Sequence, residues 1–200
     1  ILSAQDSTPS EVVLCVVEGE MWIEVAGGAP SMMVGTMECI QIPAGHSWRA
    51  RMGAKGGKVL RVDSFHPHFV PAQRLMPALE QPHQLAIADR QMLIYTDYVR
   101  GGVLNFAPGF VADKHFHHDA DEIFWFFAGE CRVETPHGVV LAPAGTIVYT
   151  EPGEWHIIEN PTNEPLLMFL TVTPNLVPSH TFFDAAGQPT VRSWEPLRGR

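Results

Sequence analysis

The chain has 200 residues, of which 46% are hydrophobic and 18% charged, and its formal net charge is −9. This length suits one large domain or two small ones with a substantial core. The acidic balance argues against nucleic acid as a partner, and no apolar run approaches the roughly 18 residues of a membrane span, so no membrane partner is expected.

Short runs of β-branched and aromatic residues, each bounded by Gly or Pro, predict strands along most of the chain. They cover residues 11–17, 21–25, 38–43, 122–127, 131–135, 146–150, 155–159 and 166–173. Turn signals every 8–12 residues favour an all-β barrel or sandwich. Residues 77–91 are expected to form a linker with a helical turn. Beyond Pro174 we expect an irregular tail, containing His180, Phe182, Phe183 and Trp194, that packs back on the barrel.

The three cysteines, Cys15, Cys39 and Cys131, are an odd number and include no C-x-x-C pair. Such usage is not a disulfide framework, and it is typical of a reducing compartment. The sequence therefore predicts no disulfide and a cytoplasmic location.

The two halves of the chain resemble each other. Residues 19–28 align with 129–138, and residues 35–48 align with 145–156. The alignment predicts a tandem duplication of one small β unit. The second half carries His115, His117, Glu122 and His156, and the matching residues of the first half are Gln5, Ser7, Val12 and Trp48. Because the same strands can be built without these four side chains, the fold itself does not demand them.

The most informative motif lies in residues 109–130. Five residues separate Gly109 from His115-x-His117, four more precede Glu122, and six more precede Gly129. A further histidine, His156, follows on a later strand, four residues before an asparagine. Three imidazoles and one carboxylate that converge on a point make a divalent-metal site.

Strand parity predicts which neighbours line this site. His115 and His117 are two residues apart and share a face, whereas His118 points outward. Phe124 and Phe126 share the parity of Glu122, so their rings should line the cavity and keep it dry. Ile158 shares the parity of His156. The predicted substrate pocket is therefore formed by Phe124, Phe126 and Ile158. Trp125 and Phe127 face the other side, against the other half or a second subunit, which allows a homodimer.

These residues resemble the cupin superfamily. The first cupin motif is matched at every defined position from Gly109 to Gly129, and the second is matched loosely by Gly145, Pro152, Gly153, His156 and Asn160, with a turn one residue shorter than the pattern. The resemblance implies two tandem jelly-roll-like barrels, a bicupin. The expected domains are a degenerate cupin at 1–75, a linker at 76–100, a metal-binding cupin at 101–175 and a tail at 176–200. The resemblance also implies one divalent metal ion per chain, which is Fe(II), Mn(II), Ni(II), Cu(II) or Zn(II).

Four protein ligands leave two adjacent positions on an octahedral ion, which suits a bidentate small-molecule substrate or substrate plus O2. We therefore expect an Fe(II) dioxygenase acting on a small chelating aromatic or enolic substrate, with Glu122 both a ligand and a catalytic carrier of protons. A non-redox isomerase, lyase or cyclase is the first alternative. A non-catalytic small-molecule-binding bicupin is the second. A closed structural zinc site is disfavoured, because no cysteine falls within the ligand motifs.

Overall fold

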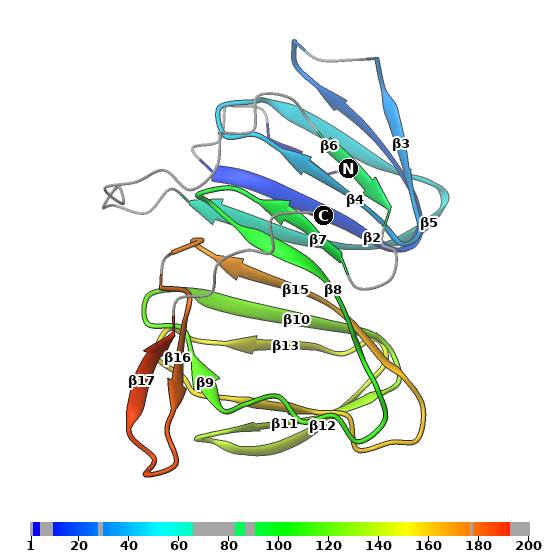
Figure 1. Cartoon of the computed structure of the whole chain (residues 1–200). Coiled ribbons are helices and arrows are strands. Elements are labelled where there is room, and N and C mark those ends of the chain that lie inside the picture. The colour runs from blue at the N-terminus through cyan, green and yellow to red at the C-terminus, as the bar shows by residue number, and fades with distance from the viewer. Residues whose placement is uncertain are drawn as a thin grey trace. The chain divides into compact units, whose positions relative to one another are not determined.

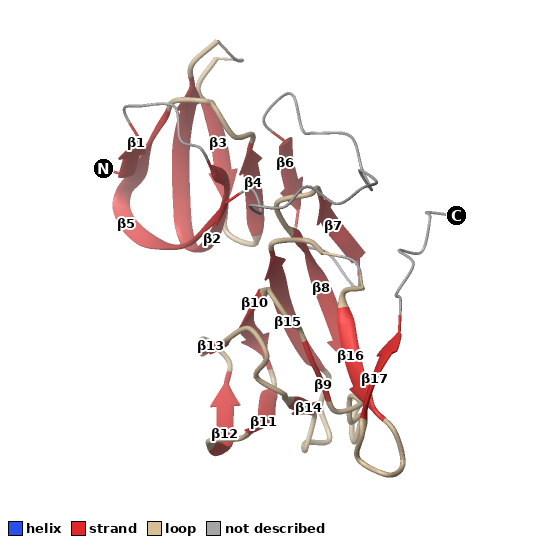
Figure 2. Ribbon diagram, turned by 90° about the vertical axis from the view of Figure 1, so that its left-hand side faces the viewer, coloured by secondary structure: helices blue, strands red, loops and turns tan. Residues whose placement is uncertain are grey.

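The computed structural model describes residues 2–4, 10–27, 30–65, 83–86, 91–176 and 178–192 (Figure 1). The chain divides into two compact units: Ile1–Ala88 with Leu93–Val99, and Asp89–Met92 with Arg100–Arg200. All regular structure in the described residues is strand, as Figure 2 shows, and the prediction of an all-β chain is confirmed. Within these ranges there is no helix with the length and apolar character needed to cross a bilayer.

The first unit is built on two long antiparallel strands, β2 (Ser10–Val25) and β5 (Trp48–Phe65). Its sheet has the order β1-β5-β2-β4-β6, with β3 paired to β2. The shorter strands are β1 (Leu2–Ala4), β3 (Met32–Gly35), β4 (Glu38–Ile42) and β6 (His83–Ala86). Alternate residues of β2, among them Val12, Leu14 and Val16, join Trp48 in one fully apolar cluster. The predicted strands at 11–17 and 21–25 are thus parts of one continuous strand.

Two of the four equivalents of the metal-site residues can be placed in this unit. Val12 and Trp48 both lie in the apolar core. Gln5 and Ser7 lie outside the described residues. At the two described positions that correspond to Glu122 and His156, the first unit therefore has packed apolar side chains.

Gly19 and Gly129, which the internal alignment superposes, have the same backbone conformation. Their φ angles are 86° and 83°, in the left-handed region that favours glycine. A Cβ at Gly19 would lie 2.5 Å from the Gly56 carbonyl oxygen, and one at Gly129 would lie 2.8 Å from the Pro165 carbonyl oxygen. Both positions therefore require glycine for conformation and for space.

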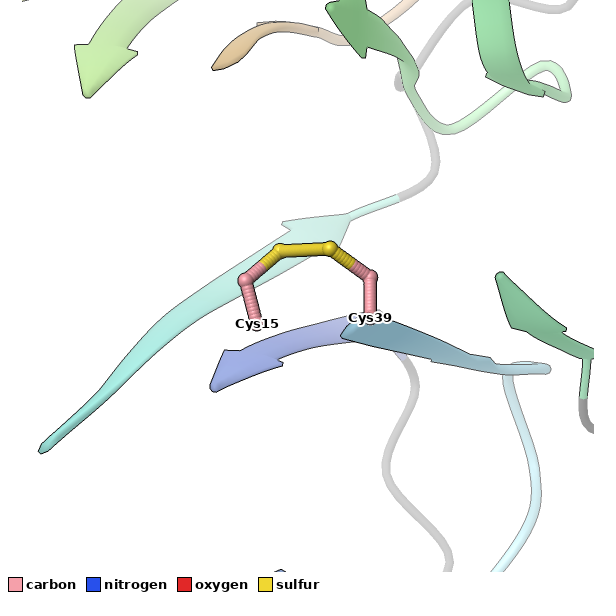
Figure 3. Close-up of a disulfide and its surroundings, with 2 residues drawn as sticks. All are labelled: Cys15 and Cys39. Atoms are coloured by element: carbon pink, nitrogen blue, oxygen red, sulfur yellow. A yellow bond between two sulfur atoms is a disulfide. The ribbon is translucent and has the colours of Figure 1, made fainter. Parts of the chain in front are cut away.

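Cys15 on β2 and Cys39 on β4 form a disulfide (Figure 3), so the prediction of no disulfide was wrong. The register of β2 and β4 sets the two residues directly opposite each other, with Cα atoms 4.1 Å apart. A sequence separation of 24 residues does not reveal this proximity, because it arises only when the strands pair. Cys131 is buried and not disulfide-bonded. The cysteines therefore give no support to a reducing compartment.

A buried polar cluster in the first unit centres on Glu11. One of its carboxylate oxygens, Oε1, accepts hydrogen bonds from Gln41 Nε2 and from Thr96 Oγ1, the latter at 2.8 Å. Burial raises the pKa of this carboxyl, and the two hydrogen bonds only partly oppose that effect. The ionised form is therefore less favourable in the folded chain than in the unfolded one.

We expect Glu11→Gln to stabilise the first unit increasingly as pH rises. When folding raises the pKa of a carboxyl, the resulting stability is fully present at pH values below the pKa of the unfolded state. It is lost as the pH rises through the pKa of the folded state. Glutamine keeps the accepting oxygen and cannot ionise. Urea unfolding between pH 4 and pH 7 should show the gain of the variant growing with pH. The exposed Glu20→Gln is the control and should show no such trend. A gain that is independent of pH would contradict the prediction.

The second unit packs two sheets around one core. One sheet contains β13 (Ile147–Thr150), β10 (Asp121–Ala128), β15 (Leu166–Thr173) and β8 (Arg100–Phe106), in that order. The other contains β12 (Gly138–Pro143), β11 (Glu130–Thr135) and β14 (Ile157–Glu159). Alternate residues of both sheets, such as Phe126 and Val133, meet in a continuous apolar cluster. All of the predicted strands in this unit are confirmed, although β14 is shorter than expected.

Two segments differ from expectation. Within residues 77–91, the described part His83–Ala86 is strand β6 paired with β4, not a helical turn, and residue 91 begins strand β7 (Gln91–Tyr95). The rest of that segment lies outside the described residues, as does Trp194. An irregular tail was expected after Pro174, but β16 (His180–Phe183) and β17 (Pro189–Arg192) form a hairpin there. β16 also pairs with the short strand β9 (His115–Phe116).

The turn of this hairpin explains why it forms. The Asp184 side-chain oxygen Oδ1 accepts hydrogen bonds from the backbone N–H groups of Ala186 and Gln188, at 2.9 and 2.8 Å. Gly187 supplies the positive φ of 75° that closes the turn. The hairpin lies beside β9 in both views (Figure 1, Figure 2).

Candidate metal centre

Backbone pairing brings the two histidine-bearing segments together. His115 and His156 form an antiparallel bridge in which each N–H donates to the other's carbonyl oxygen, at 3.3 and 2.9 Å. The Gly153 N–H donates to the His117 carbonyl oxygen at 2.6 Å, and Gly153 has a φ of 80°. The shortened turn before His156 therefore still delivers this histidine to the side of His115. Glu122 enters from β10.

The four side chains nominated by the sequence lie together. One donor atom from each of His115, His117, Glu122 and His156 falls within 4.8 Å of all the others. His156 Nε2 lies 3.1 Å from His115 Nε2 and 2.9 Å from Glu122 Oε2. His117 Nε2 lies 3.0 Å from the same Glu122 oxygen. Three of the four residues are buried, and His115 is partly exposed.

Backbone carbonyls set the tautomer of each histidine. His115 Nδ1 lies 2.7 Å from the Asp113 carbonyl oxygen, and His156 Nδ1 lies 3.3 Å from the Glu154 carbonyl oxygen. His117 Nδ1 hydrogen bonds to the Ser179 carbonyl oxygen. A carbonyl oxygen can only accept, so each Nδ1 donates to its carbonyl and each Nε2 is turned toward the centre. This is the arrangement by which metal-binding histidines are oriented in proteins.

The electrostatics of the group suit a cation. Burial, reinforced by the nearby His156, lowers the pKa of His115 to about 4, so this ring is neutral at pH 7. Burial alone raises the pKa of the Glu122 carboxyl, but His117 and His156 outweigh it and hold that pKa well below its usual value. An ionised carboxylate within 3.0 Å of two imidazole Nε2 atoms is stabilised by a positive charge between them, which a proton or a metal ion can supply.

The donor spacing fits a divalent ion. Bonds of about 2.1 Å put neighbouring ligands of an octahedral ion roughly 3.0 Å apart, close to the 2.9–3.1 Å between these donor atoms. The set contains nitrogen and oxygen donors and no thiolate. Burial raises the pKa of the Cys131 thiol to about 12, and this residue belongs to the apolar core, not to the donor group. The residues therefore fit one divalent metal ion whose identity they leave open.

The predicted pocket residues Phe124, Phe126 and Ile158 are all buried in the apolar cluster of the second unit. The ring centroid of Phe124 is 5.6 Å from that of His156, so Phe124 borders the donor group. Phe126 and Ile158 are buried within the apolar cluster of the second unit. Their contact with a substrate stays a prediction. His118 is exposed, as its parity indicates.

Three residues adjoin the site without having been assigned a role there from the sequence: Ser179, and two residues expected only in the tail, His180 and Phe182. Ser179 accepts the hydrogen bond from His117, and the rings of His180 and Phe182 lie 5.0 and 5.3 Å from the ring of His115. Burial, followed by the charge of Arg100, lowers the pKa of His180 to about 2, so its ring is neutral. The available signal was the run Thr181, Phe182 and Phe183, because β-branched and aromatic residues favour strands.

Asn160, the last residue of the second motif, has a structural role. Its side-chain nitrogen donates to the carbonyl oxygens of Phe106 and Glu164 at 3.0 and 2.8 Å, and its oxygen accepts from the N–H and hydroxyl of Thr162. These bonds tie together the loops that lead into β9 and out of β14. Asn160 is fully buried and is not one of the donor residues.

Comparison with known families identifies the class of this unit. Residues 102–173 match the family described as "Cupin domain". This range contains all four donor residues. Together with the all-β fold, the match indicates a cupin domain within the second unit. No curated protein matches the chain.

Solved structures share the fold at low sequence identity. A cupin 2 conserved barrel domain protein from Leptotrichia buccalis is 13% identical with a TM-score of 0.61, covering 86% of this chain and 77% of that one. AerE from Microcystis aeruginosa is 10% identical with a TM-score of 0.63, covering 85% and 80%. A mutant form of Bacillus subtilis oxalate decarboxylase is 12% identical with a TM-score of 0.58, covering 85% and 64%. These similarities establish the fold alone.

Proposed function

We propose that the chain is a metal-dependent enzyme acting on a small molecule, and that His115, His117, Glu122 and His156 hold its one divalent metal ion. The observation that carries this proposal is the convergence of four donor atoms within 4.8 Å, with every histidine Nδ1 committed to a backbone carbonyl. A chain that used these histidines only for packing would not need two Nε2 atoms within 3.0 Å of one carboxylate and the third within 3.1 Å of His156 Nε2.

Fe(II) and O2 are our first assignment, with a chelating aromatic or enolic molecule as substrate. A divalent ion would supply electrophilic activation of substrate oxygens and, if it is iron, electron transfer to O2. The carbonyl partners of the three imidazoles would hold these rings in the orientation that binds the ion. Phe124, which borders His156, would help to exclude water from the reacting atoms. Glu122 is buried against two of the imidazoles, where it could accept a proton from a bound substrate.

A non-redox isomerase, lyase or cyclase is the second candidate. The same nitrogen and oxygen donors also suit Zn(II), Mn(II), Ni(II) or Cu(II), and Lewis-acid chemistry needs no O2. Full activity with a redox-inert ion in the absence of O2 would favour this candidate.

We also propose a bicupin organisation, in which the first unit is a copy of the second without its ligands. The matching conformations of Gly19 and Gly129 support it, as do the apolar residues Val12 and Trp48 at two ligand positions. In this arrangement only the second unit is catalytic.

Metal analysis followed by O2 uptake tests the function. Mass spectrometry of the purified chain is expected to find about one metal ion per chain. After anaerobic Fe(II) loading, O2 consumption is measured against catechols, hydroxy acids and diketones. Uptake that depends on substrate supports the dioxygenase. Metal without uptake for any substrate contradicts that assignment and favours the non-redox candidate. A chain that takes up no metal, even after loading, contradicts both and leaves a non-catalytic binding protein.

A further inference from the structure

The C-terminal hairpin presents two rings to the donor group. In the antiparallel pairing of β16 with β9, Phe182 lies opposite His115 and Thr181 lies opposite Phe116. Directly opposed residues share a face, and so do residues two apart along a strand. His180 and Phe182 therefore lie on the face of His115. The ring distances agree: 5.0 Å from His180 to His115, 4.6 Å from His180 to His117 and 5.3 Å from Phe182 to His115.

These two rings form an aromatic surface beside His115, the partly exposed donor of the site. The His180 and Phe182 rings are stacked, with centroids 5.5 Å apart and planes 17° apart. Both side chains are partly exposed, as is His115. The other three donors, His117, Glu122 and His156, are buried. A molecule that reaches the exposed part of His115 would therefore lie next to the stacked rings.

The position of this surface is held by contacts on both faces of the hairpin. On the inner face, the Ser179 carbonyl oxygen accepts from His117, and the Ser179 hydroxyl lies 2.7 Å from His180 Nδ1. On the outer face, the Lys114 ammonium sits 3.6 Å from the Trp155 ring and 4.8 Å from the Phe183 ring. Lys114 and Trp155 each directly precede a donor histidine, so the hairpin is fixed to both segments that supply them.

We infer that His180 and Phe182 form an aromatic wall that selects planar conjugated molecules, such as catechols and enediols, over non-planar chelators with the same oxygen donors. The inference rests on the proposed metal centre and adds to it a preference for one class of ligand. A planar ring bound through two oxygens next to His115 can stack on this wall, whereas a short hydroxy acid has no π surface to offer. The aromatic wall is defined as these two side chains.

The test uses the full chain loaded with Co(II) and two probes, 4-nitrocatechol and glycolate. Phe182→Leu is expected to keep the Co(II) content of the unsubstituted chain and to weaken 4-nitrocatechol binding roughly three- to tenfold, with glycolate unchanged. Phe110→Leu is the matched control, the same substitution at an exposed phenylalanine whose ring contacts Phe106 and not the donor group. His180→Ala should also weaken 4-nitrocatechol, and His180→Phe should restore the preference because it returns a flat ring.

The outcomes separate this inference from the metal centre itself. No Co(II) uptake by the unsubstituted chain would contradict the proposed function. Normal uptake with equal losses for Phe182→Leu and Phe110→Leu, or parallel losses for both probes, overturns the aromatic wall alone. Loss of Co(II) from Phe182→Leu would show that Phe182 supports His115 and does not select ligands. If His180→Phe does not regain the 4-nitrocatechol binding that His180→Ala loses, the aromatic wall is likewise overturned.

Discussion

Replacing His117 with alanine is expected to lower the bound metal well below one ion per chain and to abolish metal-dependent activity. This imidazole is buried, its Nδ1 is oriented by the Ser179 carbonyl, and its Nε2 lies 3.0 Å from Glu122. Its removal takes away one of four donors and leaves the Glu122 carboxylate with one fewer partner. Metal content by mass spectrometry, measured with circular dichroism of the same samples, checks the prediction.

His118→Ala is the matched control for this experiment. The residue is adjacent in sequence and of the same type, but it is exposed and its ring contacts Phe116 at 4.7 Å, not the donor group. This variant should keep its metal and its activity. Equal metal content in the His117 and His118 variants would show that the donor assignment is wrong.

Removing the disulfide with Cys15→Ala and Cys39→Ala together is expected to lower the free energy of unfolding of the first unit by about 3 kcal/mol. The crosslink closes a loop of 24 residues, and in the chain-entropy view it restricts the unfolded chain by that amount. Denaturant unfolding of the oxidised, reduced and substituted chains measures the effect. The metal content of the second unit should not change.

Cys131→Ala separates the disulfide from general effects of cysteine substitution. Cys131 packs in the core of the second unit, so its loss creates a small cavity there without changing the first unit. If a reducing agent leaves the free energy of unfolding of the first unit unchanged, the prediction that the Cys15–Cys39 bond stabilises this unit is wrong.

Local spacing explains why so much of the candidate site could be predicted. His115 and His117 share a face because strands repeat every two residues, and this holds in any strand context. The strand runs of the second unit were recognisable for the same reason, since they combine β-branched and aromatic residues between turn signals. Strand parity also separated His118 from the donors.

Contacts that depend on strand register could not be predicted in this way. The opposition of Cys15 and Cys39 follows from the pairing of β2 with β4. The Ser179 carbonyl that orients His117 is 62 residues away in sequence. No spacing rule links such positions, because they meet only after the strands have paired. For the same reason the residues after Pro174 were expected to be irregular.

The sequence by itself determined the all-β class, the strands that build most of the second unit, and the three histidines and one glutamate that form the candidate metal centre. Each of these follows from residue type and short-range periodicity. The tertiary structure decided which distant groups surround that centre: the Ser179 carbonyl that orients His117, and the hairpin that sets His180 and Phe182 beside His115. Those neighbours come from register between distant strands, which residue spacing does not encode.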